Sequence, residues 1–83
     1  FNLLALATRM QEINQAVEER SRQLEGLGFG LFDSFHLACA EASGADIFLS
    51  TDDRLLKTAR RHEHQLKVTI RNPVVWLIEV LQE

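Results

Sequence analysis

Cysteine is nearly absent from this chain of 83 residues, and proline, methionine and tryptophan also occur only once each. The single cysteine, Cys39, excludes an intrachain disulfide, which suits a reducing cytoplasm. It lies in an apolar stretch, so we expect it to be a small buried hydrophobic residue. No apolar run approaches the length of about 20 residues that a membrane span needs, and no signal peptide is evident at the start. These absences predict a cytoplasmic protein with no membrane contact.

A strong excess of positive charge is also lacking, because the formal net charge is -3. Taken whole, this is not the footprint of a tight nucleic-acid binder. The charge is unevenly distributed, however, since residues 54–71 hold six basic side chains and one acidic side chain. Such a segment beside an acidic edge could guide a phosphate backbone towards a metal site. A solvated helix face followed by a polar loop is the alternative explanation.

A short helix and a short strand between residues 32 and 53 organise the rest of the chain. Asp33 precedes an apolar run, which is where a helix N-cap belongs, and the Ser-Gly pair at 43–44 ends that helix. The apolar run Ile47–Leu49 is typical of a strand covered on both faces. Asp52 follows that strand, and either Asp52 or Asp53 caps the next helix.

The lengths of these two elements predict that Asp33 and Asp52 meet in space. About ten helical residues span roughly 15 Å, and four or five strand residues span a similar distance. Because a tight turn makes the helix run antiparallel to the strand, the helix start lies over the strand end. That position is the carboxyl edge of a parallel sheet, where open α/β sheets bind ligands. Two carboxylates brought together there repel unless a cation or a shared proton offsets the repulsion.

The remaining pattern alternates helices with one further strand. Apolar periodicity and breaker residues predict helices over 3–25, 54–62 and 74–81, a glycine-rich turn over 26–30, and a strand over 67–70. Asn72 and Pro73 are an N-cap followed by proline at the first helical position. The two strands and the helix between them predict a parallel β-α-β unit. Two strands do not make a stable parallel sheet, so we expect further strands upstream of Phe1 or from another copy of the chain.

Three segments together resemble the C-terminal part of a PIN domain, as found in VapC-type toxins. They are LFDSFHLA at 31–38, GADIFLSTD at 44–52, and Asn-Pro at 72–73 before an apolar helix. The resemblance covers about two thirds of the chain and implies an α/β fold, a three-layer PIN-like parallel sheet flanked by helices. It also implies that residues 1–83 are the C-terminal part of a single PIN-like domain. The family's N-terminal strand and helices, with two of its acidic residues, would then precede Phe1.

The resemblance further implies a metal-dependent endoribonuclease of the toxin-antitoxin type. Asp33 and Asp52 match the family's catalytic and metal-binding acids, and Asp53 is an additional candidate ligand for Mg²⁺ or Mn²⁺, which prefer oxygen ligands. Such ions activate a water and stabilise charge on the phosphate. The other candidate residues are Ser50 and Thr51 at the strand end, which would position the metal-binding acids, and an RNA-binding set made of Arg54, Lys57, Arg60 and Arg61.

The implied partners are an RNA substrate, an antitoxin protein and a second copy of the chain in a homodimer. Two other interpretations stay open. A catalytically inactive PIN-like module could bind protein or RNA through the same scaffold, and helix capping alone would account for Asp33 and Asp52. A receiver-like signalling domain fits less well, because Lys67 begins a predicted strand rather than following one.

Overall fold

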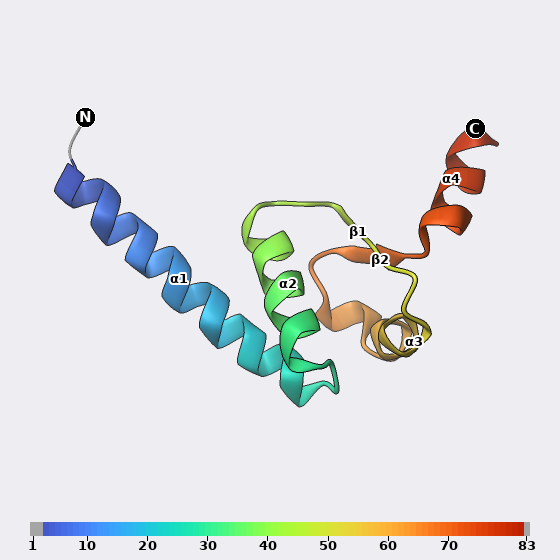
Figure 1. The fold of residues 1–83 in the computed structure, drawn as a ribbon, viewed down its shortest axis with the longest axis horizontal. Helices are drawn as coiled ribbons and strands as arrows, with labels where there is room; N and C mark the ends of the chain where they lie inside the picture. Colours follow the sequence, from blue (N-terminus) through green and yellow to red (C-terminus); the bar gives the residue numbers. More distant parts are fainter. Residues whose placement is uncertain (1–2, 83) are drawn as a thin grey trace.

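The computed structural model describes residues 3–82, with side chains described from residue 12 onward (Figure 1). In chain order the elements are α1 (Leu3–Gly26), α2 (Leu31–Ala42), β1 (Ile47–Leu49), α3 (Asp53–Arg61), a 3₁₀ turn η1 (Glu63–Gln65), β2 (Thr69–Arg71) and α4 (Pro73–Leu81). α1 runs diagonally to the base of α2, the two strands lie beside α2 and above α3, and α4 leaves the end of β2 (Figure 1). The expected sequence of helices and strands is therefore present.

The prediction of a three-layer α/β sheet is wrong for the described residues. They contain a sheet of only two strands, β1 and β2, which pair in parallel with Ile47 opposite Thr69 and Leu49 opposite Arg71. Helices make up most of the chain. Ile47 and Leu49 remain 40% and 44% exposed, so β1 is not covered on both faces as its sequence predicts. Three consecutive apolar residues suggested a strand buried on both faces, but composition alone does not show which faces of a strand are covered.

Local capping by side chains explains where two of the helices, α3 and α4, begin. Asp52 accepts hydrogen bonds from the backbone N–H groups of Arg54 and Leu55, and Asn72 accepts from Val74 and Val75 in the same way. Pro73 then occupies the first turn of α4, where its missing N–H costs no hydrogen bond. α2 begins differently, because Gly30 is its N-cap and makes no side-chain cap bond. Asp33 lies inside the first turn, so its predicted role as N-cap is wrong.

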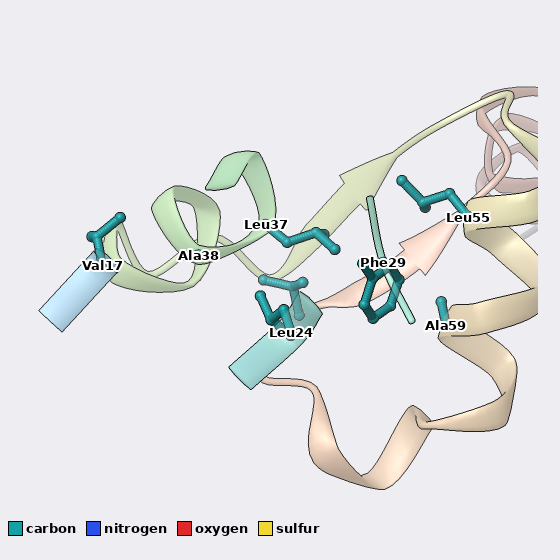
Figure 2. Close-up of a cluster of buried hydrophobic side chains, with 8 residues drawn as sticks. Val17, Leu24, Phe29, Leu37, Ala38, Leu55 and Ala59 are labelled. Atoms are coloured by element: carbon teal, nitrogen blue, oxygen red, sulfur yellow. The ribbon is translucent and has the colours of Figure 1, made fainter. Parts of the chain in front are cut away.

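The hydrophobic core joins three helices through the loop between α1 and α2. Its buried members are Val17, Leu24, Phe29, Leu37, Ala38, Leu55, Ala59 and Val68. Figure 2 shows Phe29 between the pair Leu24 and Leu37 on one side and the α3 residues Leu55 and Ala59 on the other. The loop side chain therefore connects the α1–α2 pair to α3. Gly28 permits this turn because its φ of 112° is in the region that favours glycine.

An ion pair adds a polar connection to this apolar core. Arg20 on α1 donates two hydrogen bonds to the Glu41 carboxylate on α2, from Nε at 2.6 Å and from Nη2 at 3.1 Å. Arg20 also donates to the carbonyl oxygen of Gln65 at 2.6 Å, and the Lys67 backbone N–H donates to Glu41 at 2.8 Å. The Glu41 side chain is only 3% exposed. This cluster ties α1, α2 and the segment before β2 together.

Much apolar surface stays exposed outside the core. On α4, the exposed apolar residues are Val74, Val75, Leu77, Ile78, Val80 and Leu81. On α2, Phe32 and Phe35 are exposed beside Cys39, which is exposed as well. The prediction of a buried Cys39 is therefore wrong, because α2 buries the face that carries Ser34, Leu37 and Ala38.

Candidate functional site: a cavity lined by three aspartates

The predicted acidic residues line one cavity of about 720 Å³ between the α1–α2 loop and the start of α3. We call it the aspartate cavity. Its lining residues are Gly28, Phe29, Gly30, Asp33, Asp52, Asp53, Arg54, Leu55, Lys57, Thr58 and Arg61. Asp33 and Asp52, predicted from the element lengths to lie at a common edge, both line this cavity although they are 19 positions apart in the sequence. Their role as metal ligands stays a prediction.

Asp52 is held in place by backbone hydrogen bonds on both sides. One carboxylate oxygen, Oδ1, accepts from the N–H groups of Arg54 at 2.9 Å and Leu55 at 3.3 Å. The backbone N–H of Asp52 donates to Ser50 Oγ at 3.1 Å. These bonds fix the carboxylate at the N-terminus of α3, where the helix dipole stabilises negative charge. The second oxygen, Oδ2, makes no hydrogen bond to another described group, so capping leaves it available to a ligand.

Asp33 reaches the cavity from the first turn of α2. The Ser34 backbone N–H donates to the Gly30 carbonyl at 2.8 Å, which starts the helix at Leu31. A Cβ atom at Gly30 would lie 3.7 Å from Asp33 Oδ2, so the carboxylate lies close against this backbone. Asp33 is half-buried. It therefore contributes a charge to the cavity and to the helix N-terminus without acting as the N-cap.

The other candidate residues divide between this cavity and its surroundings. Asp53 lines the cavity as the first residue of α3. Ser50 positions Asp52 through the hydrogen bond described above, whereas Thr51 is exposed and its side chain makes no hydrogen bond to another described residue. Of the predicted RNA-binding side chains, Arg54, Lys57 and Arg61 line the cavity, whereas Arg60 lies in a separate groove on the other side of α3.

The charges around the aspartate cavity balance. Three carboxylates and three basic side chains line it, so an anionic phosphate can approach the cations without meeting a net negative field.

Among residues 12–82, no three His, Cys, Asp or Glu side chains are close enough to hold one metal ion. One or two carboxylates are nevertheless a common protein share of a Mg²⁺ shell, which keeps several waters and substrate phosphate oxygens. The residues present therefore fit a water-rich cation site with few protein ligands.

The glycine-rich loop belongs to this site, which its sequence did not indicate. Gly28, Phe29 and Gly30 form one wall of the cavity, whereas the sequence indicated only a turn between helices. Gly28 has a positive φ, and Phe29 anchors the loop in the core. The signal was available in the three glycines of residues 26–30, but their spacing matches no phosphate-binding motif.

Compared with known proteins, the chain matches no family model, no curated protein and no solved structure. The resemblance to the PIN family therefore stays a prediction based on three short segments. Among residues 3–82, no helix combines the length and the apolar character needed to cross a membrane.

Proposed function

We propose that the chain supplies part of the active site of a metal-dependent endoribonuclease of the PIN type. The observation that carries this proposal is a cavity lined by three aspartates and three basic side chains. Carboxylate oxygens suit Mg²⁺ or Mn²⁺, and arginine and lysine suit phosphate oxygens. A metal-dependent site that cleaves phosphodiesters uses both. RNA rather than DNA as the substrate, an antitoxin partner and a homodimer rest on the resemblance alone.

The residues in and around the aspartate cavity would have three different roles, namely binding the cation, binding phosphate and positioning Asp52. One or two of the carboxylates of Asp33, Asp52 and Asp53 would hold the cation, which supplies Lewis-acid stabilisation of the phosphate and a more acidic bound water. Arg54, Lys57 and Arg61 bind and orient the phosphate backbone along α3. Ser50 keeps the Asp52 backbone in place through its 3.1 Å hydrogen bond. The cap bonds to Oδ1 orient the carboxylate so that only Oδ2 remains for the cation.

The proposal is tested by metal binding and RNA cleavage on the same set of variants. Asp52→Asn keeps the N-cap, because asparagine caps helices as well as aspartate does, but removes a negative ligand. Asp46→Asn removes an exposed carboxylate at the other end of β1, outside the cavity. We expect Mn²⁺ to bind the chain in a calorimetric titration, Asp33→Asn and Asp52→Asn to abolish that binding, and Asp46→Asn to leave it unchanged. Cleavage of a labelled single-stranded RNA should follow the same order and stop with EDTA.

A second candidate is a catalytically inactive module that binds RNA or protein. The observation that favours it is the lack, within residues 12–82, of three clustered ligand side chains. RNA binding that depends on Lys57 and Arg61 but persists in EDTA, without cleavage in Mg²⁺ or Mn²⁺, would support this module. The nuclease proposal would then be wrong for this chain. Loss of both metal binding and RNA binding would contradict both candidates and leave the aspartates as helix-stabilising groups.

A further inference from the structure

Another concave surface formed by the described residues lies on the opposite side of α3 from the aspartate cavity. We call it the β2 groove. It has a volume of about 620 Å³ and runs between α3 and the outer edge of β2. Its floor is made by Leu56, Ala59, Val68 and Ile70, and Arg60 and Lys67 stand on its rim. Ala59 and Val68 are 6% and 5% exposed, so the floor belongs to the packed core.

The strand that borders this groove has an unpaired edge. The Thr69 N–H donates to the Asp46 carbonyl at 2.9 Å, and the Arg71 carbonyl accepts from Ser50 at 3.0 Å. Because backbone groups alternate in direction along a strand, Ile70 directs its N–H and C=O away from β1. No strand among residues 3–82 pairs with that edge. The five consecutive residues 68–72 line the groove, so the free edge and the apolar floor belong to one surface.

We propose that the β2 groove binds an extended acidic peptide, which adds to the sheet as a third strand beside β2. A groove between an edge strand and a helix is the geometry in which peptides bind by strand addition. Ile70 supplies one donor and one acceptor for main-chain hydrogen bonds. A segment of about five residues, roughly 17 Å long, would span residues 68–72. The inference does not depend on whether the chain cleaves RNA.

The side chains around the groove define the chemistry of this peptide. Alternate side chains of an added strand point to opposite sides, so one set faces the apolar floor and the other faces the rim. The rim carries Arg60 and Lys67 against the single acid Glu63, and the nearby Arg71 is already paired with Glu79 on α4. Apolar residues that alternate with Asp or Glu therefore complement this surface. Single-stranded RNA fits less well, because the groove lining contains no Phe, Tyr or Trp on which a base could stack.

Fluorescence anisotropy with defined peptides tests the proposal directly. The probe is a labelled eight-residue peptide in which Glu and Val alternate. We expect saturable binding of this peptide to the full chain. We expect affinity at least tenfold lower for a peptide of the same composition with Glu and Val in two blocks, and for a peptide in which Lys replaces Glu. Hydrogen exchange of the Ile70 amide should slow when the alternating peptide binds, because this N–H becomes hydrogen-bonded.

Matched variants separate the groove from general electrostatic attraction. Arg60→Glu with Lys67→Glu reverses the rim charge and should lower the affinity at least tenfold. Lys57→Glu with Arg61→Glu makes the same charge change on the aspartate-cavity side of α3 and should change it less than threefold. Ile70→Pro removes the outward N–H without removing a hydrogen bond to β1, which edge strands tolerate, and should weaken binding about tenfold.

The same experiments can overturn the inference. It is wrong if none of the peptides binds, if both charge reversals weaken binding equally, or if the Ile70 amide exchanges at the same rate with and without peptide. Binding of oligouridine that depends on Arg60 and Lys67, in the absence of peptide binding, would assign the groove to nucleic acid instead. Exchange at Ile70 is measured in the unmodified chain, so this result decides the matter even if Ile70→Pro fails to fold.

Discussion

Replacing Glu41 with glutamine tests the cluster that ties α1, α2 and the segment before β2 together. The Glu41 carboxylate accepts three hydrogen bonds, two from Arg20 and one from the Lys67 backbone N–H. A glutamine has one acceptor oxygen and one NH₂ group. Because both oxygens of the Glu41 carboxylate accept hydrogen bonds, the NH₂ group of glutamine would point at a hydrogen-bond donor. Arg20 also loses its charge partner while only 19% of its side chain is exposed. The substitution therefore leaves a largely buried donor and a largely buried charge unsatisfied.

The expected loss in the free energy of unfolding is about 2–3 kcal/mol. This range follows from the cost of unsatisfied buried groups and of breaking a largely buried ion pair, lowered because Arg20 keeps its bonds to Gln65 and Gln23. A chain of this size has a total stability of roughly 4–12 kcal/mol. The loss should lower the midpoint of thermal unfolding by about 10–20 °C.

The pH dependence of stability provides an independent measure of the same cluster. Burial alone would raise the pKa of Glu41, but the hydrogen bonds from Arg20 and from the Lys67 backbone, together with their charges, outweigh burial and hold this pKa below its ordinary value. The bond to Glu41 likewise raises the pKa of Arg20. A carboxylate with a depressed pKa in the folded state stabilises the fold above its unfolded pKa of about 4.3. That stabilisation is lost as the pH falls through the folded-state pKa.

Urea and thermal unfolding followed by circular dichroism measure both effects. The matched control is Glu18→Gln, which breaks an ion pair with Arg22 whose side chains are 65% and 71% exposed. An exposed pair of this kind contributes at most about 0.5 kcal/mol. The reasoning is refuted if Glu41→Gln costs no more than Glu18→Gln. It is also refuted if the unmodified chain and Glu41→Gln lose stability equally between pH 5 and about pH 3.

Three further substitutions test other parts of the structure by the same unfolding measurements. Ser34→Ala removes a buried hydroxyl that has no hydrogen-bond partner among the described residues, so stability should stay unchanged or rise by up to about 1 kcal/mol; a clear loss would show that the hydroxyl is bonded. Leu37→Ala empties a fully buried position and should cost about 3 kcal/mol, whereas a loss below about 1 kcal/mol would contradict the core assignment. Asp52→Ala removes the α3 N-cap and should cost about 1 kcal/mol, while Asp52→Asn costs little; equal losses would argue against capping.

Local sequence signals predicted the secondary structure well. Asn72 followed by Pro73 marked the start of α4, and Asp52 marked the start of α3, because a cap acts on backbone groups only two or three residues away. Asp33 shows where such signals fail. It has the chemistry of an N-cap, but Leu31 and Phe32 join the helix before it, and Gly30 takes the cap position. A helix end can therefore lie two residues from the best capping residue.

Long-range features were much less predictable from the sequence. The common cavity of Asp33 and Asp52 could be predicted because element lengths and a tight turn constrain the two ends. The cluster of Arg20 and Glu41 could not, because the partners are 21 positions apart and nothing local pairs them. The exposure of Cys39 and of Ile47 was also missed. Composition indicates that a residue is apolar, but only tertiary packing decides which face of its element is covered.

The few attachments of α4 predict that this helix opens before the rest of the molecule. This helix of nine residues is held to the rest of the chain by the Asn72 cap, by Val75 at the end of the β2 groove and by a surface ion pair between Arg71 and Glu79. Isolated helices shorter than about 12 residues are marginal in water, so α4 forms a separate unit of low local stability. Its amides should exchange, and proteases should cut within it, while the core around Leu24 and Leu37 remains closed.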